Sequence, residues 1–262
     1  MFLLPIATAA LFSASAEVPL APLERTWGGS SECDARAILV EAGGTAKLPE
    51  AGRDEDPAGF VRLNQHVLDA WERARPCSTV ARSLEGPFAL FHVAQVLAAS
   101  AQTQSDPVQK AEGALEAFAA GNDAAAGPMV ATMVSRAVHM EAVGIVEEAW
   151  SSIGPDDRRR ILQRLRALHA ARPPMDLESE RLAVREIAAK SWLGGTCIQA
   201  HAEALVHVEE ALRTGPDALD LARGATVSEW LTGCGAGMEQ VTRLFLEDEA
   251  RIAATIASLP ER

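Results

Sequence analysis

The sequence of 262 residues contains no tyrosine, and its only lysines are Lys47, Lys110 and Lys190. Acidic residues outnumber basic ones by 36 to 24, which gives a formal net charge of −12. Because an acidic chain repels a phosphate backbone, we do not expect nucleic acid to be a partner. Hydrophobic residues make up 48% of the chain and charged residues 23%, a composition that is typical of folded globular proteins.

Local motifs of common enzyme classes are also missing. The sequence has no His-Glu-x-x-His zinc site, no phosphate-binding glycine loop, no Gly-x-Ser-x-Gly nucleophile turn and no dinucleotide-binding glycine pattern. These absences exclude enzymes that carry such signatures and indicate no cofactor. They leave open a helical enzyme, or a protein that binds a small ligand or a metal, whose site is assembled from distant residues.

The first residues form an uncharged apolar run that ends in Ala14-Ser15-Ala16 and is followed by Glu17. Small residues at positions 14 and 16 are typical of a signal-peptide cleavage site, although no Lys or Arg precedes the run. The run is shorter than the roughly 20 residues that span a bilayer. We therefore expect a signal peptide at residues 1–16, no transmembrane segment, and an exported protein in the periplasm or outside the cell.

Four cysteines follow this segment, at positions 33, 77, 197 and 234. An even number in an oxidising compartment is normally paired, and four cysteines allow three connectivities. Pairing within each half of the chain encloses the shortest loops. We therefore predict disulfides between Cys33 and Cys77 and between Cys197 and Cys234.

Apolar residues recur at spacings of three and four along most of the chain, and no segment shows the alternation of a strand. Residues 17–30 carry Pro and Gly without periodicity, so we expect a flexible tether there. Residues 31–262 are predicted to form one all-helical domain, an irregular multi-helix bundle or stacked helical hairpins with eight or nine helices. A subdivision near residues 173–174 is an open alternative. The sequence shows no fixed repeat.

Several local signals place individual helices. Ser31 is expected to cap a helix that ends at Gly43-Gly44. Asp106-Pro107 predicts another helix start, since Asp favours the N-cap and Pro the first turn. Further predictions are one amphipathic helix over residues 60–71, a buried apolar helix from Pro87, a turn at Gly121-Asn122-Asp123, and a long helix over residues 124–150.

Two groups of residues could bind a metal. Glu203, His207 and Glu210 have spacings that place them on one helix face, but no second copy of the pattern exists, so a solvated face is the favoured interpretation. Methionines 129, 133 and 140 also align, beside His139, in a pattern that exported copper proteins use. Arg136 and Glu147 share that stripe, so core packing is favoured and no metal is expected.

Two further patterns were weighed. Cys197 and His201 are four residues apart and could form a thiolate–imidazole pair, but only if Cys197 were free, and the disulfide is favoured. A helix near residue 160 carries a basic face that could dock on anionic lipid or an acidic partner. A solvated surface is the more common role of such a face, which consists of Arg158, Arg159, Arg160, Arg164 and Arg166.

These observations favour a non-enzymatic exported protein that binds another exported or envelope protein or serves as a scaffold. The support is the many helices, the paired cysteines and the missing motifs, and the alternative of an assembled catalytic or ligand site stays open. The sequence contains no pattern that defines the partner or the oligomeric state.

Overall fold

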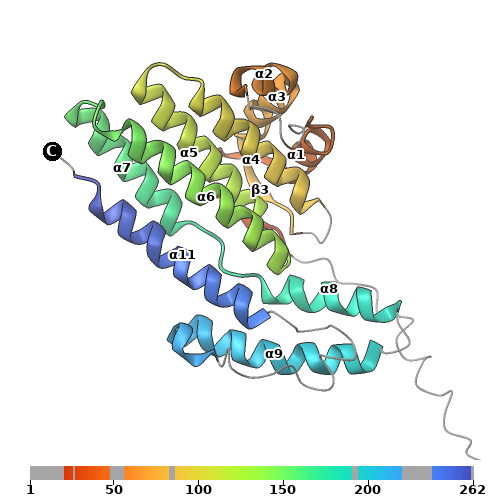
Figure 1. Cartoon of the computed structure of the whole chain (residues 1–262). Coiled ribbons are helices and arrows are strands. Elements are labelled where there is room, and N and C mark those ends of the chain that lie inside the picture. The colour runs from red at the N-terminus through yellow and green to blue at the C-terminus, as the bar shows by residue number, and fades with distance from the viewer. Residues whose placement is uncertain are drawn as a thin grey trace, which may run out of the picture.

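The computed structural model describes residues 21–25, 27–47, 56–82, 86–190, 194–219 and 238–260. Within these ranges the protein is mostly helical, as predicted, with ten α-helices, one short 3₁₀ helix and three short strands (Figure 1). The helix count exceeds the expected eight or nine because one predicted helix is broken in two. The expected signal peptide, residues 1–16, lies outside the described residues.

The break falls at Asn64, between α2 (Pro57–Leu63) and α3 (Gln65–Ala74). The fully buried Asn64 amide donates to the carbonyl of Phe60 at 2.9 Å, and its Oδ1 accepts the N–H of Lys47 at 2.8 Å. A side chain that bonds backbone groups in this way competes with helix continuation. The predicted single helix over residues 60–71 is therefore wrong, and Leu63 is 59% exposed rather than buried.

Three adjacent helices form the centre of the molecule: α4 (Pro87–Gln102), α5 (Pro107–Ala124) and α6 (Met129–Trp150). The predicted start of α5 is confirmed, because Asp106 caps the N–H groups of Val108 and Gln109 and Pro107 opens the helix. α4 and α5 approach closely at Gly113, where an added Cβ would meet the Cβ of Ala101 at 3.0 Å. Small residues thus bring the two backbones together along this contact.

The predicted turn at Gly121-Asn122-Asp123 is wrong, since these residues form the last full turn of α5. The side chains of Asn122 and Asp123 have buried partners, and these interactions outweigh the turn preference of both residues. The Asn122 amide donates to the carbonyl of Leu168 at 3.1 Å, and Asp123 pairs with Arg25. The chain reverses after Ala125 instead, and α6 begins at Met129 rather than at residue 124.

α6 is, among the described residues, the one helix with the length and mean hydropathy (1.3) to cross a membrane. Within α6, 56% of the most apolar stretch is buried inside the protein. Its contacts with α5 and α4 are those of a core helix.

A second group of helices follows α7 (Pro155–Ala170) and consists of α8 (Leu177–Ala189), α9 (Gly194–Thr214), the 3₁₀ helix η2 (Pro216–Ala218) and α11 (Met238–Ser258). Figure 1 shows α8 and α9 at one end of the molecule, with α11 running from them along α7. The first part of α11 packs with Leu205 in a second hydrophobic cluster. Its last turns, at Ile252 and Ile256, enter the main core. α11 therefore belongs to both hydrophobic clusters.

A small sheet lies beside α1 (Ala35–Gly44), where the sequence predicted no strand and a tether. Its strands are β1 (Leu23–Glu24), β2 (Ser31–Asp34) and β3 (Cys77–Val80), in the order β1-β3-β2. β1 pairs with β3 antiparallel and β2 pairs with β3 parallel. Strands of two to four residues are too short to show an alternation pattern. Asp34, not Ser31, caps α1 by accepting the N–H of Arg36.

Candidate functional site

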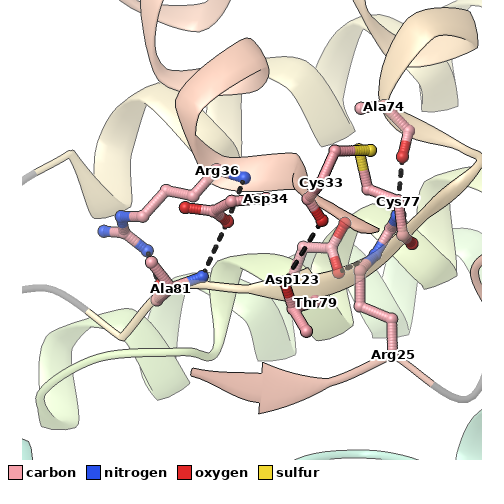
Figure 2. Close-up of a disulfide and its surroundings, with 9 residues drawn as sticks. All are labelled: Arg25, Cys33, Asp34, Arg36, Ala74, Cys77, Thr79, Ala81 and Asp123. Carbon is pink, nitrogen blue, oxygen red and sulfur yellow. Dashed lines mark hydrogen bonds and ion pairs between the residues drawn. A yellow bond between two sulfur atoms is a disulfide. The ribbon is translucent and has the colours of Figure 1, made fainter. Parts of the chain in front are cut away.

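A disulfide joins the small sheet across two neighbouring strands, as Figure 2 shows. Cys33 of β2 and Cys77 of β3 are bonded, with their Cα atoms 4.7 Å apart, so this predicted pair is confirmed. The Thr79 hydroxyl donates to the carbonyl of Cys33, which ties the same two strands again. The bond therefore fixes the start of α1 against the strand that follows α3.

Beneath the disulfide, a buried arginine holds the N-terminal segment in place (Figure 2). Arg25 donates its Nε–H to Asp123 Oδ1 at 2.9 Å and its Nη1 hydrogens to the carbonyls of Ala74 (2.7 Å) and Cys77 (2.9 Å). Its guanidinium also lies 5.8 Å from the ring centroid of Trp71. The expected tether is thus anchored at residues 21–25, because a desolvated guanidinium is stable only where anions and carbonyls surround it.

The Asp123 carboxyl is the anion of this centre, and burial raises its pKa to about 6 although Arg25 partly offsets the shift. A neighbouring buried arginine, Arg36, donates to the carbonyls of Ala81 (3.3 Å) and Ala126 (3.2 Å), and burial lowers its pKa. These groups have no exposed face on which a substrate could bind. Their arrangement is structural.

A second buried polar group surrounds His139 of α6. Its ring stacks on Phe118 with 4.2 Å between centroids and is 3% exposed. Burial lowers the pKa of His139 well below its usual value, and the positive charge of Arg172 and the proximity of His169 lower it further. Arg172 pairs with Glu249 of α11, and burial lowers the pKa of Arg172 to about 10. In the sequence His139 stands out only as a neighbour of the methionines, since nothing local marks a histidine that is buried by distant helices.

The predicted metal candidates lie along α9. Glu203 is exposed and accepts a hydrogen bond from Gln199 at 3.1 Å, and Glu210 pairs with Arg213. His207, which lies between them in the sequence, is half-buried. Among the described residues no group of three or more His, Cys, Asp or Glu side chains could hold a metal ion.

The methionine stripe is divided between different surroundings. Met129 is buried in the second hydrophobic cluster, Met140 packs against the main core, and Met133 is 38% exposed. Arg136, on the same stripe, pairs with Asp248 of α11. The three thioethers therefore do not line one site.

Cys197 is 3% exposed and is held in a disulfide. Its predicted partner, Cys234, lies outside the described residues. His201 is buried, and its Nε2 lies 3.4 Å from Glu180 Oε1 of α8, whose other oxygen accepts the N–H of Met129 at 2.7 Å. A bonded sulfur is no nucleophile, so Cys197 and His201 do not form a thiolate–imidazole pair.

The basic face of α7 is largely neutralised by its neighbours. Arg160 pairs with Glu112 and Asp157, and these hydrogen bonds raise its pKa. Arg164 pairs with Glu116 of α5. A shallow hollow of about 250 Å³ lies on this face, but all the residues that line it belong to α7 alone. The structure thus leaves less free positive charge for an anionic partner than the sequence suggested.

A groove lies where α3, α4 and α5 meet. This α3–α5 groove has a volume of about 230 Å³ and is lined by side chains of α3, α4 and α5. Its apolar floor includes the buried Trp71 and Leu97, and the half-buried Leu68. Its rim carries three carboxylates, which belong to Asp69, Glu72 and Glu116.

No local sequence pattern marks these groove residues, because they come from helices that only the fold brings together. Comparisons with protein-family models, with curated proteins and with solved structures found no match to this chain.

Proposed function

We propose that this is an exported, disulfide-bonded helical protein that binds another exported or envelope protein through the α3–α5 groove. The observation that carries the proposal is the groove itself, in which α3 and α4 supply an apolar floor and α5 closes one side. Its volume of about 230 Å³ is below the roughly 300–1,000 Å³ of typical small-molecule sites. That size suits one or two side chains of a protein segment better than a metabolite.

The buried ionisable groups support binding rather than catalysis. Asp123 and Arg25 hold each other below the sheet, and Arg172 holds Glu249 at the end of α7. His139 is closed to solvent. A catalytic group must reach its substrate within hydrogen-bond distance, and these side chains face only the protein interior.

The overall arrangement proposed for the helices is an irregular multi-helix bundle rather than a stack of hairpins. α11 packs against α6, α7 and α9, so its neighbours come from distant parts of the sequence. Stacked hairpins would contact mainly the units next to them in the chain.

Export is the second part of the proposal. Its support is the apolar run before Glu17 together with the Cys33–Cys77 disulfide, since disulfides persist in oxidising compartments. N-terminal sequencing of the protein recovered from the periplasm or the medium should begin at Glu17. A cytoplasmic protein that retains residues 1–16 would contradict export.

Site-specific photo-crosslinking tests protein binding at the groove. Gln65, at the groove, donates to Asp69 at 3.1 Å, and Gln199 on α9 donates to Glu203 at the same distance. These two exposed glutamines are a matched pair. A photo-reactive residue at position 65, exposed to the envelope fraction of the source cells, should yield a discrete adduct that position 199 does not yield. Excess unlabelled protein should suppress that adduct. Equal adducts from both positions, or none from position 65, would refute the proposal.

A further inference from the structure

We infer that the occupant of the α3–α5 groove is a basic segment of the partner, which places an Arg or Lys side chain over the apolar floor and against the carboxylate rim. This inference rests on the proposed function and adds the chemistry of the partner. Its basis is the distribution of charge around the groove.

The three rim carboxylates differ in how many hydrogen bonds and ion pairs they already make within the protein. Glu116 is committed to the fold, because it accepts the Trp71 indole N–H at 3.0 Å and pairs with Arg164. Arg75 serves two rim carboxylates, since it pairs with Glu72 at 3.1 Å and its Nε lies 3.6 Å from Glu116 Oε2. The Glu72 pair is the more open one, because 64% of the Glu72 side chain and 46% of the Arg75 side chain are exposed. An ion pair so open to water contributes little and exchanges readily for a new partner.

Asp69 is the rim carboxylate that is most able to accept a new ion pair. It is exposed and accepts a hydrogen bond from the neutral amide of Gln65 at 3.1 Å. Within the described part of the chain, no Lys, Arg or His lies within ion-pair distance of it. An incoming guanidinium or ammonium would therefore find one unpaired carboxylate, and a second that it can share with Arg75.

The floor suits the apolar part of such a side chain. Long basic side chains bury their aliphatic stems on apolar surface and keep the charged end in water. Leu68 and Leu97 supply that surface. The net charge of −12 also attracts a basic partner over a longer range and raises its rate of encounter.

Synthetic peptides test this chemistry directly. The probe is a fluorescein-labelled octapeptide of alternating Arg and Leu, compared with peptides in which every Arg is replaced by citrulline or by Glu. Fluorescence anisotropy against the full mature protein should show binding of the Arg peptide that weakens with added salt. The citrulline and Glu peptides should bind at least about tenfold more weakly.

Two double variants separate local from overall charge. Asp69→Arg with Glu72→Arg reverses the groove rim, whereas Glu41→Arg with Glu203→Arg reverses two exposed carboxylates elsewhere and changes the net charge equally. The groove variant should weaken binding of the Arg peptide about tenfold or more, and the control less than about twofold. Equal weakening by both variants would overturn the inference.

A milder pair, Asp69→Asn with Glu72→Gln, repeats the test if the charge reversal disturbs folding, which thermal melting monitors. If the adduct from position 65 forms with the partner and this neutral variant leaves it unchanged, protein binding stands and the basic occupant is refuted. If no adduct forms and no peptide binds, both proposals fail.

Discussion

Replacing Asp123 with asparagine should remove a pH dependence of stability that this one buried carboxyl creates. Its pKa in the folded protein is about 6, against an ordinary value of 3.8 in an unfolded chain. Between these values the folded protein binds a proton that the unfolded chain does not. The free energy of unfolding therefore falls as pH rises from about 4 to about 6, and the contribution of Asp123 is constant outside this window. At about 1.36 kcal/mol per pKa unit, the loss is about 3 kcal/mol.

Asparagine keeps an oxygen that can accept the Nε–H of Arg25, but it cannot ionise. The difference in unfolding free energy between Asp123→Asn and the unmodified protein should therefore shift by about 3 kcal/mol between pH 4 and pH 7.5, in favour of the variant at the higher pH. Urea denaturation followed by far-ultraviolet circular dichroism, with the disulfides intact, measures this difference. The exposed Glu41 offers a control, since Glu41→Gln should change stability by less than about 0.5 kcal/mol.

Two results would refute this reasoning. If the curves of stability against pH run parallel for the two proteins, Asp123 does not titrate in the window. If instead the unmodified protein gains stability over the variant as pH rises toward about 4 and the two curves run parallel above it, attraction by Arg25 outweighs burial and the pKa is lowered.

Three further outcomes are expected. Cys33→Ala with Cys77→Ala opens a loop with a sequence separation of 44 residues, which corresponds to about 4 kcal/mol and a melting temperature lower by roughly 8–16 °C in calorimetry. Gly121→Ala should destabilise by about 1–3 kcal/mol, because its Cβ would lie 2.7 Å from His139 Nε2, whereas Gly144→Ala, with nothing within 4 Å, should stabilise by up to about 1 kcal/mol in urea denaturation. His139→Phe should abolish a loss of unfolding free energy, about 1.4 kcal/mol per pH unit, that begins as pH falls below the ordinary histidine pKa of 6.5. Only the unfolded chain takes up that proton, so equal acid sensitivity in both proteins would contradict the prediction.

The elements that the sequence predicted correctly have local causes. Asp106 and Pro107 start α5 because capping and a fixed φ act within one turn. Periodic apolar residues located α7 and α11 for the same reason, since a 3.6-residue period is a property of one segment. Cys33 and Cys77 were paired correctly because a short enclosed loop is favoured.

The failures arise where a distant partner overrides a local preference. Asn122 and Asp123 carry turn chemistry, yet the carbonyl of Leu168 and the guanidinium of Arg25 hold them inside a helix. Arg25 itself lay in a segment without periodicity, and only its partners on other elements show that it is buried. The α3–α5 groove was missed for the same reason, because its floor and rim come from three helices.

The position of α11 in both hydrophobic clusters has a consequence for the order of folding. The helices of the main core are synthesised long before the residues of α11 that cover them, and Ile252 follows its neighbour α6 by about a hundred residues. Contacts so distant in sequence close large loops and form late. A nascent chain that has not yet made α11 therefore exposes apolar surface on both clusters at once, and this intermediate is the form most exposed to aggregation and proteolysis.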